Sequence, residues 1–122
     1  MILAIVGSVR LGSSPAVFRE VRRVLYKYRP EEIISGNNEG VDSVVERVAR
    51  EFGIYHHALP VEVHRWDGAG QIGYKQRNEQ IATCCDRLVR IDEPQPLTNG
   101  TAWTLDYARK LGKPTEETII AA

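Results

Sequence analysis

The sequence has no excess of charge of either sign and no long apolar run. It contains 16 Lys and Arg residues against 16 Asp and Glu residues, and its isoelectric point is about 6.8. Proteins that coat nucleic acid are expected to carry a strongly basic face, so this balance argues against that class. The opening apolar stretch Met1–Val6 is too short for a signal peptide, and no stretch approaches the roughly 20 apolar residues of a membrane span. We therefore expect a soluble, cytoplasmic protein.

Cysteine and histidine are also scarce. The two cysteines, Cys84 and Cys85, are adjacent, and adjacent cysteines rarely bridge each other because the short loop strains the disulfide. We expect two buried free thiols. The three histidines, His56, His57 and His64, lack cysteine or carboxylate partners at metal-ligand spacing, so we expect no metal site.

At 122 residues, the chain is long enough for one domain with a substantial core but too short for two. Short apolar runs alternate with helical patterns, which is typical of a parallel sheet built from βαβ units. The cleanest helical pattern runs from Val41 to Phe52 and stops at Gly53, and another helix starts at Ser14-Pro15. The expected strands cover residues 2–6, 33–34, 55–59, 87–91 and 118–121, and the expected helices cover about 15–28, 41–52, 71–85 and 101–111.

Strict alternation of strands and helices predicts an α/β, Rossmann-like fold with three layers, in which helices cover both faces of a five-stranded parallel sheet. We expect the strand order 3-2-1-4-5. This order puts the most apolar strand, residues 2–6, in the middle, and the strand that contains His56 and His57 at an edge. The order reverses between the first and fourth strands, and open α/β sheets bind ligands at such a switch point.

Three polar segments with glycine follow predicted strands and should therefore meet at the carboxyl edge of the sheet. They are residues 7–10, 35–42 and 98–101. Glycine allows close approach to the backbone, and the N–H groups at a helix start attract anions. Hydroxyl and guanidinium groups in these segments suit phosphate or ribose oxygens, and the side chains concerned are Ser8, Arg10 and Thr101.

A fourth segment, residues 73–78, brings Arg77 and Asn78 to the start of the third helix, beside the same edge. They either face a ligand or lie on a solvated helix face with Arg77 paired to a nearby acid, and spacing alone does not decide between these. Two common phosphate-binding motifs are absent: the Walker loop G-x-x-x-x-G-K-[ST], and the G-x-G-x-x-G of dinucleotide dehydrogenases.

With these segments, the sequence resembles the SLOG superfamily. More narrowly, it resembles small stand-alone domains of unknown function related to the DNA-processing protein A family and to the LOG (lysine-decarboxylase-like) proteins. The similar segments are IVGSVR, ISGNNEGVDSVVERVAREFGI, GYKQRNEQIATCCDRLVRI and NGTAWTLDYARKLGKP. The resemblance implies one Rossmann-like domain over residues 1–122 that binds nucleotides, nucleotide-derived signals or single-stranded DNA. It implies ligand-binding roles for Gly7, Ser8, Arg10, Gly36, Gly40, Asp42, Arg77, Asn78, Gly100 and Thr101.

Two departures from the family pattern bear on the ligand. The family has a second glycine and a small residue after the first glycine of the second loop, whereas this chain has Asn37 and Asn38. Asparagine tolerates left-handed backbone conformations, so the turn can form, and both side chains add hydrogen-bonding groups to the expected site. The catalytic LOG pattern P-G-G-x-G-T-x-x-E is absent, which removes most of the basis for a phosphoribohydrolase.

Three functions stay open. The convergence of loops favours a sensor-like binding domain for a nucleotide or nucleotide derivative. An alternative is an enzyme that cleaves an N-glycosidic or phosphate bond of a nucleotide. Arg10 or Arg77 would then hold phosphate, and an acid near the crevice, namely Glu39, Asp42 or Glu46, would orient water or steady a sugar cation. Single-stranded DNA binding is the third, and neutral charge and small size disfavour it.

The sequence also leaves self-association open, because small Rossmann-like domains often form homo-oligomers through their helices. Of the two tryptophans, Trp103 is expected to pack in the core. Trp66 lies in a loop beside the predicted site, where it either stacks on a base or packs.

Overall fold

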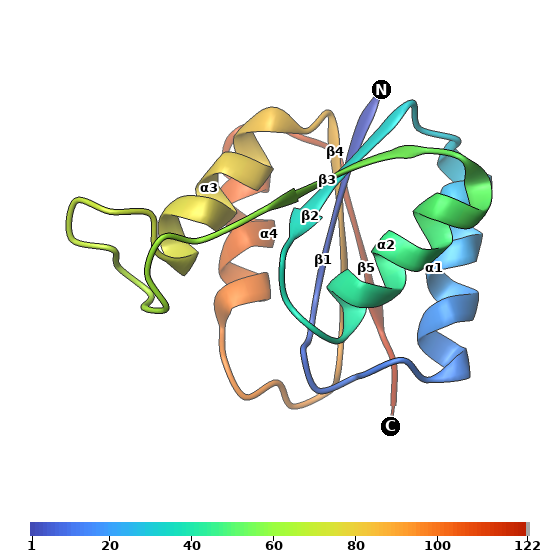
Figure 1. Cartoon of the computed structure of the whole chain (residues 1–122), viewed down its shortest axis with the longest axis horizontal. Helices are drawn as coiled ribbons and strands as arrows, with labels where there is room; N and C mark the ends of the chain where they lie inside the picture. Colours follow the sequence, from blue (N-terminus) through green and yellow to red (C-terminus); the bar gives the residue numbers. More distant parts are fainter. Residues whose placement is uncertain (122) are drawn as a thin grey trace.

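A computed structural model of the chain describes residues 1–121 and consists of strands and helices in strict alternation (Figure 1). The strands are β1 (Ile2–Gly7), β2 (Glu32–Gly36), β3 (Tyr55–Leu59), β4 (Arg87–Asp92) and β5 (Thr115–Ile119), and the helices are α1 (Pro15–Tyr28), α2 (Val41–Phe52), α3 (Tyr74–Cys84) and α4 (Gly100–Lys110). All neighbouring strands pair in parallel, in the order β3-β2-β1-β4-β5. The predicted α/β Rossmann-like fold and its strand order are confirmed.

The helices form a layer on each face of the sheet, with α1 and α2 on one side and α3 and α4 on the other (Figure 1). Successive side chains of a strand point to opposite faces, so β1 contributes to two cores. Leu3 and Ile5 are fully buried against α1 and α2, while Ala4 and Val6 pack with residues of α3 and α4. Each fully buried Leu or Ile stabilises the fold by roughly 1.5–3 kcal/mol.

Local signals in the sequence fix the ends of α1 and α2. Ser14 caps α1 by accepting a hydrogen bond from the N–H of Val17, and Pro15 occupies the first turn. Arg29 ends α1 in a left-handed conformation with φ of 45°. Gly53, with φ of 67°, ends α2 at the predicted position.

The start of α3 differs from the prediction, because the helix begins at Tyr74 rather than near Gln71. The side-chain carbonyl of Gln76 accepts hydrogen bonds from the N–H groups of Gly68, at 2.9 Å, and Gly73, at 3.0 Å. These bonds hold the preceding residues in a loop, where the carbonyl of Ile72 accepts from the N–H of Glu62 at 2.7 Å.

The predicted bounds of the last strand were also wrong, because β5 spans 115–119 whereas the sequence predicted 118–121. It pairs with β4 from Leu88 opposite Thr115 to Asp92 opposite Ile119. The acidic residues at the centre of β5 made it hard to recognise as a strand from the sequence. They are tolerated because Glu116 pairs with basic side chains of α1 and Glu117 pairs with Arg90 of β4.

Two smaller points concern the cysteines and the membrane. Cys85 is buried as expected, but Cys84 is exposed, which corrects that part of the prediction. Within residues 1–121, no helix has the length and apolar character needed to cross a membrane.

Gly7 is needed for packing where β1 ends. A Cβ atom on Gly7 would lie 2.4 Å from the carbonyl oxygen of Ile91 and 2.6 Å from the Cβ atom of Val41. We therefore expect Gly7→Ala to lower the free energy of unfolding by roughly 1–3 kcal/mol, measured by urea denaturation.

Gly100→Ala is the matched control, because a Cβ there has no neighbour closer than 3.7 Å. It should change stability by less than about 0.5 kcal/mol. Equal effects of the two substitutions would contradict this account of Gly7.

Candidate functional site

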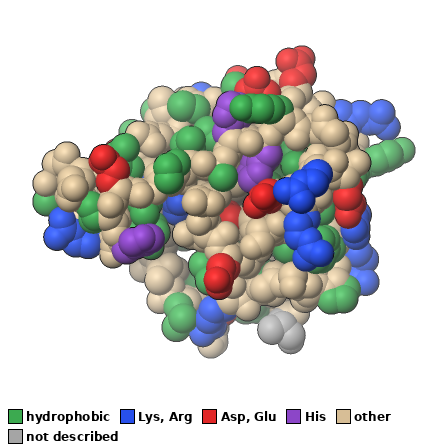
Figure 2. All heavy atoms as spheres, in the orientation of Figure 1, with side chains coloured by type: hydrophobic (Ala, Val, Ile, Leu, Met, Phe, Trp, Pro, Cys, Tyr) green, Lys and Arg blue, Asp and Glu red, His purple; other side chains and the backbone are tan. Residues whose placement is uncertain are grey.

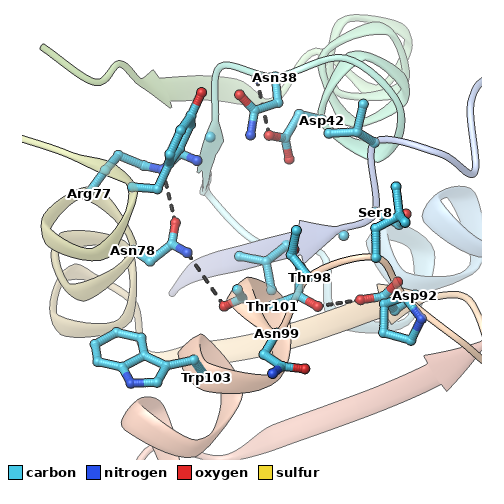
Figure 3. Close-up of a pocket in the computed structure, with 18 of the residues that line it drawn as sticks. Ser8, Asn38, Asp42, Arg77, Asn78, Asp92, Thr98, Asn99, Thr101 and Trp103 are labelled. Atoms are coloured by element: carbon cyan, nitrogen blue, oxygen red, sulfur yellow. Dashed lines mark hydrogen bonds between the residues drawn. The ribbon is translucent and has the colours of Figure 1, made fainter. Parts of the chain in front are cut away.

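A cavity of about 650 Å³ opens at the carboxyl edge of the sheet, where β1 and β4 end (Figure 3). It lies at the switch point that the strand order predicts, between the loops that follow β1, β2 and β4 and the first turns of α3 and α4. Of the residues predicted to bind ligand, those that line this cavity are Gly7, Ser8, Arg10, Gly36, Asn38, Asp42, Arg77, Asn78, Gly100 and Thr101.

Asn37 and Gly40, by contrast, do not line the cavity. Asn37 is exposed. Gly40 has φ of 73°, and a Cβ on it would lie 2.5 Å from the carbonyl oxygen of Ser8 and 2.4 Å from that of Val9. The N–H of Val41 donates to the Ser8 carbonyl at 3.2 Å. The glycine therefore lets the second loop pack on the first, rather than letting a ligand approach the backbone.

A buried carboxylate lies at one end of the cavity. Asp42 is only 7% exposed and accepts a hydrogen bond from the N–H of Asn38 at 3.2 Å. Gly36 separates Asp42 from Arg77, and a Cβ on Gly36 would lie 2.7 Å from an atom of each side chain. Burial raises the pKa of Asp42 from 3.8 to about 6, although the positive charge of Arg77 and the Asn38 N–H oppose this shift. The group can therefore exchange a proton near neutral pH.

The structure excludes one of the two interpretations of Arg77, the solvated position. This side chain is 4% exposed, so it does not lie on a solvated helix face. Its Nε donates to Oδ1 of Asn78 at 2.9 Å, and its Nη1 donates to the carbonyl of Leu59 at 3.2 Å. Burial lowers the pKa of Arg77, and the nearby carboxylate of Asp42 opposes this change. The Arg77–Asn78 pair thus forms a fixed polar wall of the cavity (Figure 3).

Glu93 does not itself line the cavity but bonds to two residues that do, and sequence reasoning missed it. The hydroxyl of Ser8 donates to its Oε2 at 2.7 Å, and Nε of Arg10 donates to the same oxygen at 3.1 Å. Nη2 of Arg10 pairs with Oε1 of Glu93 and donates to the carbonyl of Gln95 at 3.1 Å. The pKa of Glu93 is lowered, chiefly by the hydrogen bond from Arg10. Ser8 and Arg10 therefore bond to the protein itself.

Thr101 is engaged in a similar way. Its hydroxyl donates to Oδ2 of Asp92 (Figure 3) and accepts from Nε of Arg90 at 2.9 Å. Arg90 also donates from Nη2 to Asp92 at 3.1 Å and pairs through Nη1 with Glu117. This network at the end of β4 orients the start of α4. The Thr101 hydroxyl is occupied within it.

The backbone at the start of α4 offers free donors. Asn99 precedes the helix, but its side chain does not cap it. Within residues 1–121, no acceptor is bonded to the N–H groups of Gly100, Thr101 and Ala102, whereas the N–H of Trp103 donates to the carbonyl of Asn99 at 2.8 Å. Gly100 and Thr101 line the cavity, so the positive end of the helix dipole faces it.

Both tryptophans line the cavity and contact each other. The rings of Trp66 and Trp103 meet edge-to-face with centroids 5.2 Å apart, and Trp103 stacks on Tyr107 at 5.3 Å. The expectation that Trp103 packs in the core is therefore wrong, because its half-buried ring forms a cavity wall. Trp66 is 41% exposed and also lies at the cavity, as its loop position allowed.

The histidines have separate partners. Nε2 of His56 lies 2.6 Å from the hydroxyl of Ser35, and Nδ1 of His64 lies 2.8 Å from the hydroxyl of Tyr74. His57 has a carboxylate of Glu32 at 3.5 Å. Over the described part of the chain, no group of three or more His, Cys, Asp or Glu side chains could hold a metal ion.

The molecular surface carries charges of both signs. On the face that Figure 2 shows, blue basic and red acidic side chains are interspersed. Oppositely charged side chains also form ion pairs on the protein, such as Arg22 with Glu51 at 2.9 Å between α1 and α2. This mixture does not favour binding along a nucleic-acid backbone.

No protein-family model and no curated protein matches the chain. Among solved structures, the structural-genomics target TM1055 superposes with a TM-score of 0.70 and 23% identity, over 93% of this chain and 71% of that one. The molybdenum cofactor carrier protein of Chlamydomonas reinhardtii superposes with a TM-score of 0.68 and 17% identity, over 95% of this chain and 75% of that one. At these identities the likeness shows a Rossmann-like fold.

The raised pKa of Asp42 predicts a specific dependence of stability on pH. Between pH 3.8 and about 6, the folded protein keeps a proton on Asp42 that the unfolded chain has released. The free energy of unfolding should therefore fall as pH rises through this interval, by roughly 2–3 kcal/mol from this group. Asp42→Asn cannot release a proton at this position, so this contribution should vanish.

Urea denaturation at a series of pH values measures the effect. The difference in slope between the parent and Asp42→Asn isolates Asp42 from the other carboxylates. Identical slopes for the two proteins would show that burial does not raise this pKa.

Proposed function

We propose that residues 1–122 form one nucleotide-binding domain of the SLOG type, which holds a nucleotide or nucleotide-derived molecule in the cavity at the β1–β4 edge. The observation that carries this proposal is the combination, in one cavity, of an aromatic wall and a helix start with free N–H groups. The cavity volume of about 650 Å³ lies within the range of about 300–1,000 Å³ that small-molecule sites have.

The aromatic wall suits a planar base. Trp66 and Trp103 line the cavity and meet edge-to-face, and Tyr74 lines it as well. Stacking of a base on an aromatic side chain contributes about 1–3 kcal/mol and tolerates different bases. This wall supplies affinity without fixing which base is bound.

The start of α4 suits a phosphoryl group. Free N–H groups at a helix start, together with the positive end of the helix dipole, form an anion site. The side chains of Thr98 and Asn99 line the cavity next to these N–H groups and add polar atoms. Asp42 and Asn78 also line the cavity and offer acceptors and donors for sugar hydroxyls or the edge of a base (Figure 3).

The structural comparison agrees with ligand carriage as the general role. One of the similar folds belongs to a molybdenum cofactor carrier protein. A carrier needs a preformed cavity with fixed walls, and here Arg77 and Arg10 are each held by hydrogen bonds within the protein.

Tryptophan fluorescence tests the proposal directly, because the chain's two tryptophans, Trp66 and Trp103, both line the cavity. We expect a nucleoside, nucleotide, cyclic nucleotide, NAD or ADP-ribose to quench this fluorescence and raise the melting temperature. Trp66→Ala should weaken binding by about tenfold, since one stacking contact is lost.

Tyr55→Ala is the matched control, because Tyr55 is an exposed aromatic residue of β3 outside the cavity. It should bind as the parent does. Absence of any response across the panel, or equal effects of both substitutions, would count against a nucleotide site in this cavity.

A second candidate function, cleavage of a nucleotide, rests on Asp42 alone. Its carboxyl group lies in the cavity with a pKa of about 6, which suits general acid–base chemistry near neutral pH. Glu39 and Glu46, the other acids considered for this role, are exposed and do not line the cavity.

If the protein cleaves nucleotides, chromatography should detect a free base or phosphate. Asp42→Asn should then reduce turnover at least about a hundredfold. Glu46→Gln, which alters an exposed acid of the same helix, should leave turnover unchanged. Lack of product across the panel would leave the binding function without catalysis.

A further inference from the structure

The arginines at the cavity are all accompanied by carboxylates. Arg10 and Arg77 are the basic side chains that line the cavity, and Arg90 lies behind it in β4. Arg10 pairs with Glu93, Arg77 faces Asp42 across Gly36, and Arg90 pairs with Asp92 and Glu117, as described above. The positive charge of each guanidinium is therefore balanced within the protein.

Arg10 is the member of this set that a ligand could reach. Its side chain is 48% exposed, whereas Arg77 and Arg90 are 4% and 8% exposed as residues. A second or third phosphoryl group would extend beyond the start of α4, where its charge would need a further cation. Arg10 is the accessible candidate on the described rim of the cavity.

Arg10 is already paired with Glu93. Glu93 is 8% exposed, so it lies beneath the loop surface, and Ser8 also bonds to it. Both Nε and Nη2 of Arg10 point to this carboxylate. The hydrogen bond from Arg10 lowers the pKa of Glu93, which keeps the carboxylate ionised at neutral pH. A polyphosphate would therefore meet, at Arg10, a cation whose charge a buried carboxylate already balances.

We propose that Glu93 determines the class of ligand by holding Arg10, so that phosphoryl groups beyond the first gain no contact with Arg10 and the site does not select polyphosphates. This inference rests on the proposed nucleotide-binding function for the identity of the ligand, and on the Arg10–Glu93 pair for the lack of selection.

The test compares Glu93→Gln with a matched control. Glu93→Gln keeps the shape of the side chain and removes its charge. Glu51→Gln makes the same change in the Arg22–Glu51 pair, which also has hydrogen bonds from both Nε and Nη2 but lies on the outer surface of α1 and α2. Isothermal titration calorimetry would measure binding of orthophosphate, inorganic tripolyphosphate, AMP and ATP, with circular dichroism as the check on folding.

We expect the parent to bind ATP no more tightly than AMP, and tripolyphosphate no more than about threefold more tightly than orthophosphate. Glu93→Gln should gain about tenfold in affinity for tripolyphosphate and ATP, because one charge-assisted contact with Arg10 becomes available. Glu51→Gln should show no gain. If the increased affinity of Glu93→Gln comes from Arg10, the double variant Arg10→Gln/Glu93→Gln should not show this increase.

The outcomes separate this inference from the proposed function. If neither AMP nor ATP binds, and Glu93→Gln still gains affinity for tripolyphosphate, the proposed nucleotide function fails and the role of Glu93 stands. If nucleotides bind and Glu93→Gln shows no gain, the role of Glu93 is overturned. The parent measurements need no variant, so a tenfold preference of the parent for ATP over AMP, or for tripolyphosphate over orthophosphate, would also overturn it.

Discussion

Strand order reverses between β1 and β4, and the cavity exists because of this reversal. The chain leaves β1 toward α1 on one face of the sheet and leaves β4 toward α4 on the other face. The two connections diverge, so the space beyond the paired residues Gly7 and Ile91 is not filled by either helix. The position of the site is therefore a property of the topology, and the loops decide what the site can bind.

The loops around this space are held by contacts with each other. Gly40 lies against the carbonyls of Ser8 and Val9, which joins the second loop to the first. Glu93 joins the fourth strand's loop to the first through Ser8 and Arg10. Close backbone approach and buried hydrogen bonds make the rim a connected unit, so that a preformed cavity does not require a bound ligand for its shape.

Patterns among residues that are close together in the sequence predicted most of the fold. The period of α2, the Ser14-Pro15 start of α1 and the polar residues of β3 were enough to place those elements and the sheet order. The start of β5 was missed because its central acids, Glu116 and Glu117, resemble a loop until their basic partners in α1 and β4 are known.

In the candidate site, too, features set by neighbouring residues were predictable from the sequence, whereas features that depend on distant residues were not. Gly7, Ser8 and Arg10 were recognisable because they follow a strand directly, and they do line the cavity. Glu93 was not recognisable, because its role depends on side chains more than 80 positions away in the chain. Trp103 was assigned to the core since a large apolar residue in a helix usually packs there, and only the tertiary structure shows that its ring faces the cavity.

The charged groups buried at this edge are costly for stability. Asp42 is buried without a direct ion pair, with a pKa of about 6, and Arg77 is buried beside it with hydrogen bonds to Asn78 and Leu59. Apolar residues of similar size would fold at least as well in many proteins. Perturbed acids and buried arginines that gather at one cavity, while the two cores elsewhere are apolar, indicate a site kept for binding or chemistry rather than for folding. The pairing of Arg10 with Glu93 follows the same logic, since it leaves Arg10 without unbalanced positive charge. Under the proposed function, a ligand would then be recognised by shape, stacking and hydrogen bonds more than by total charge.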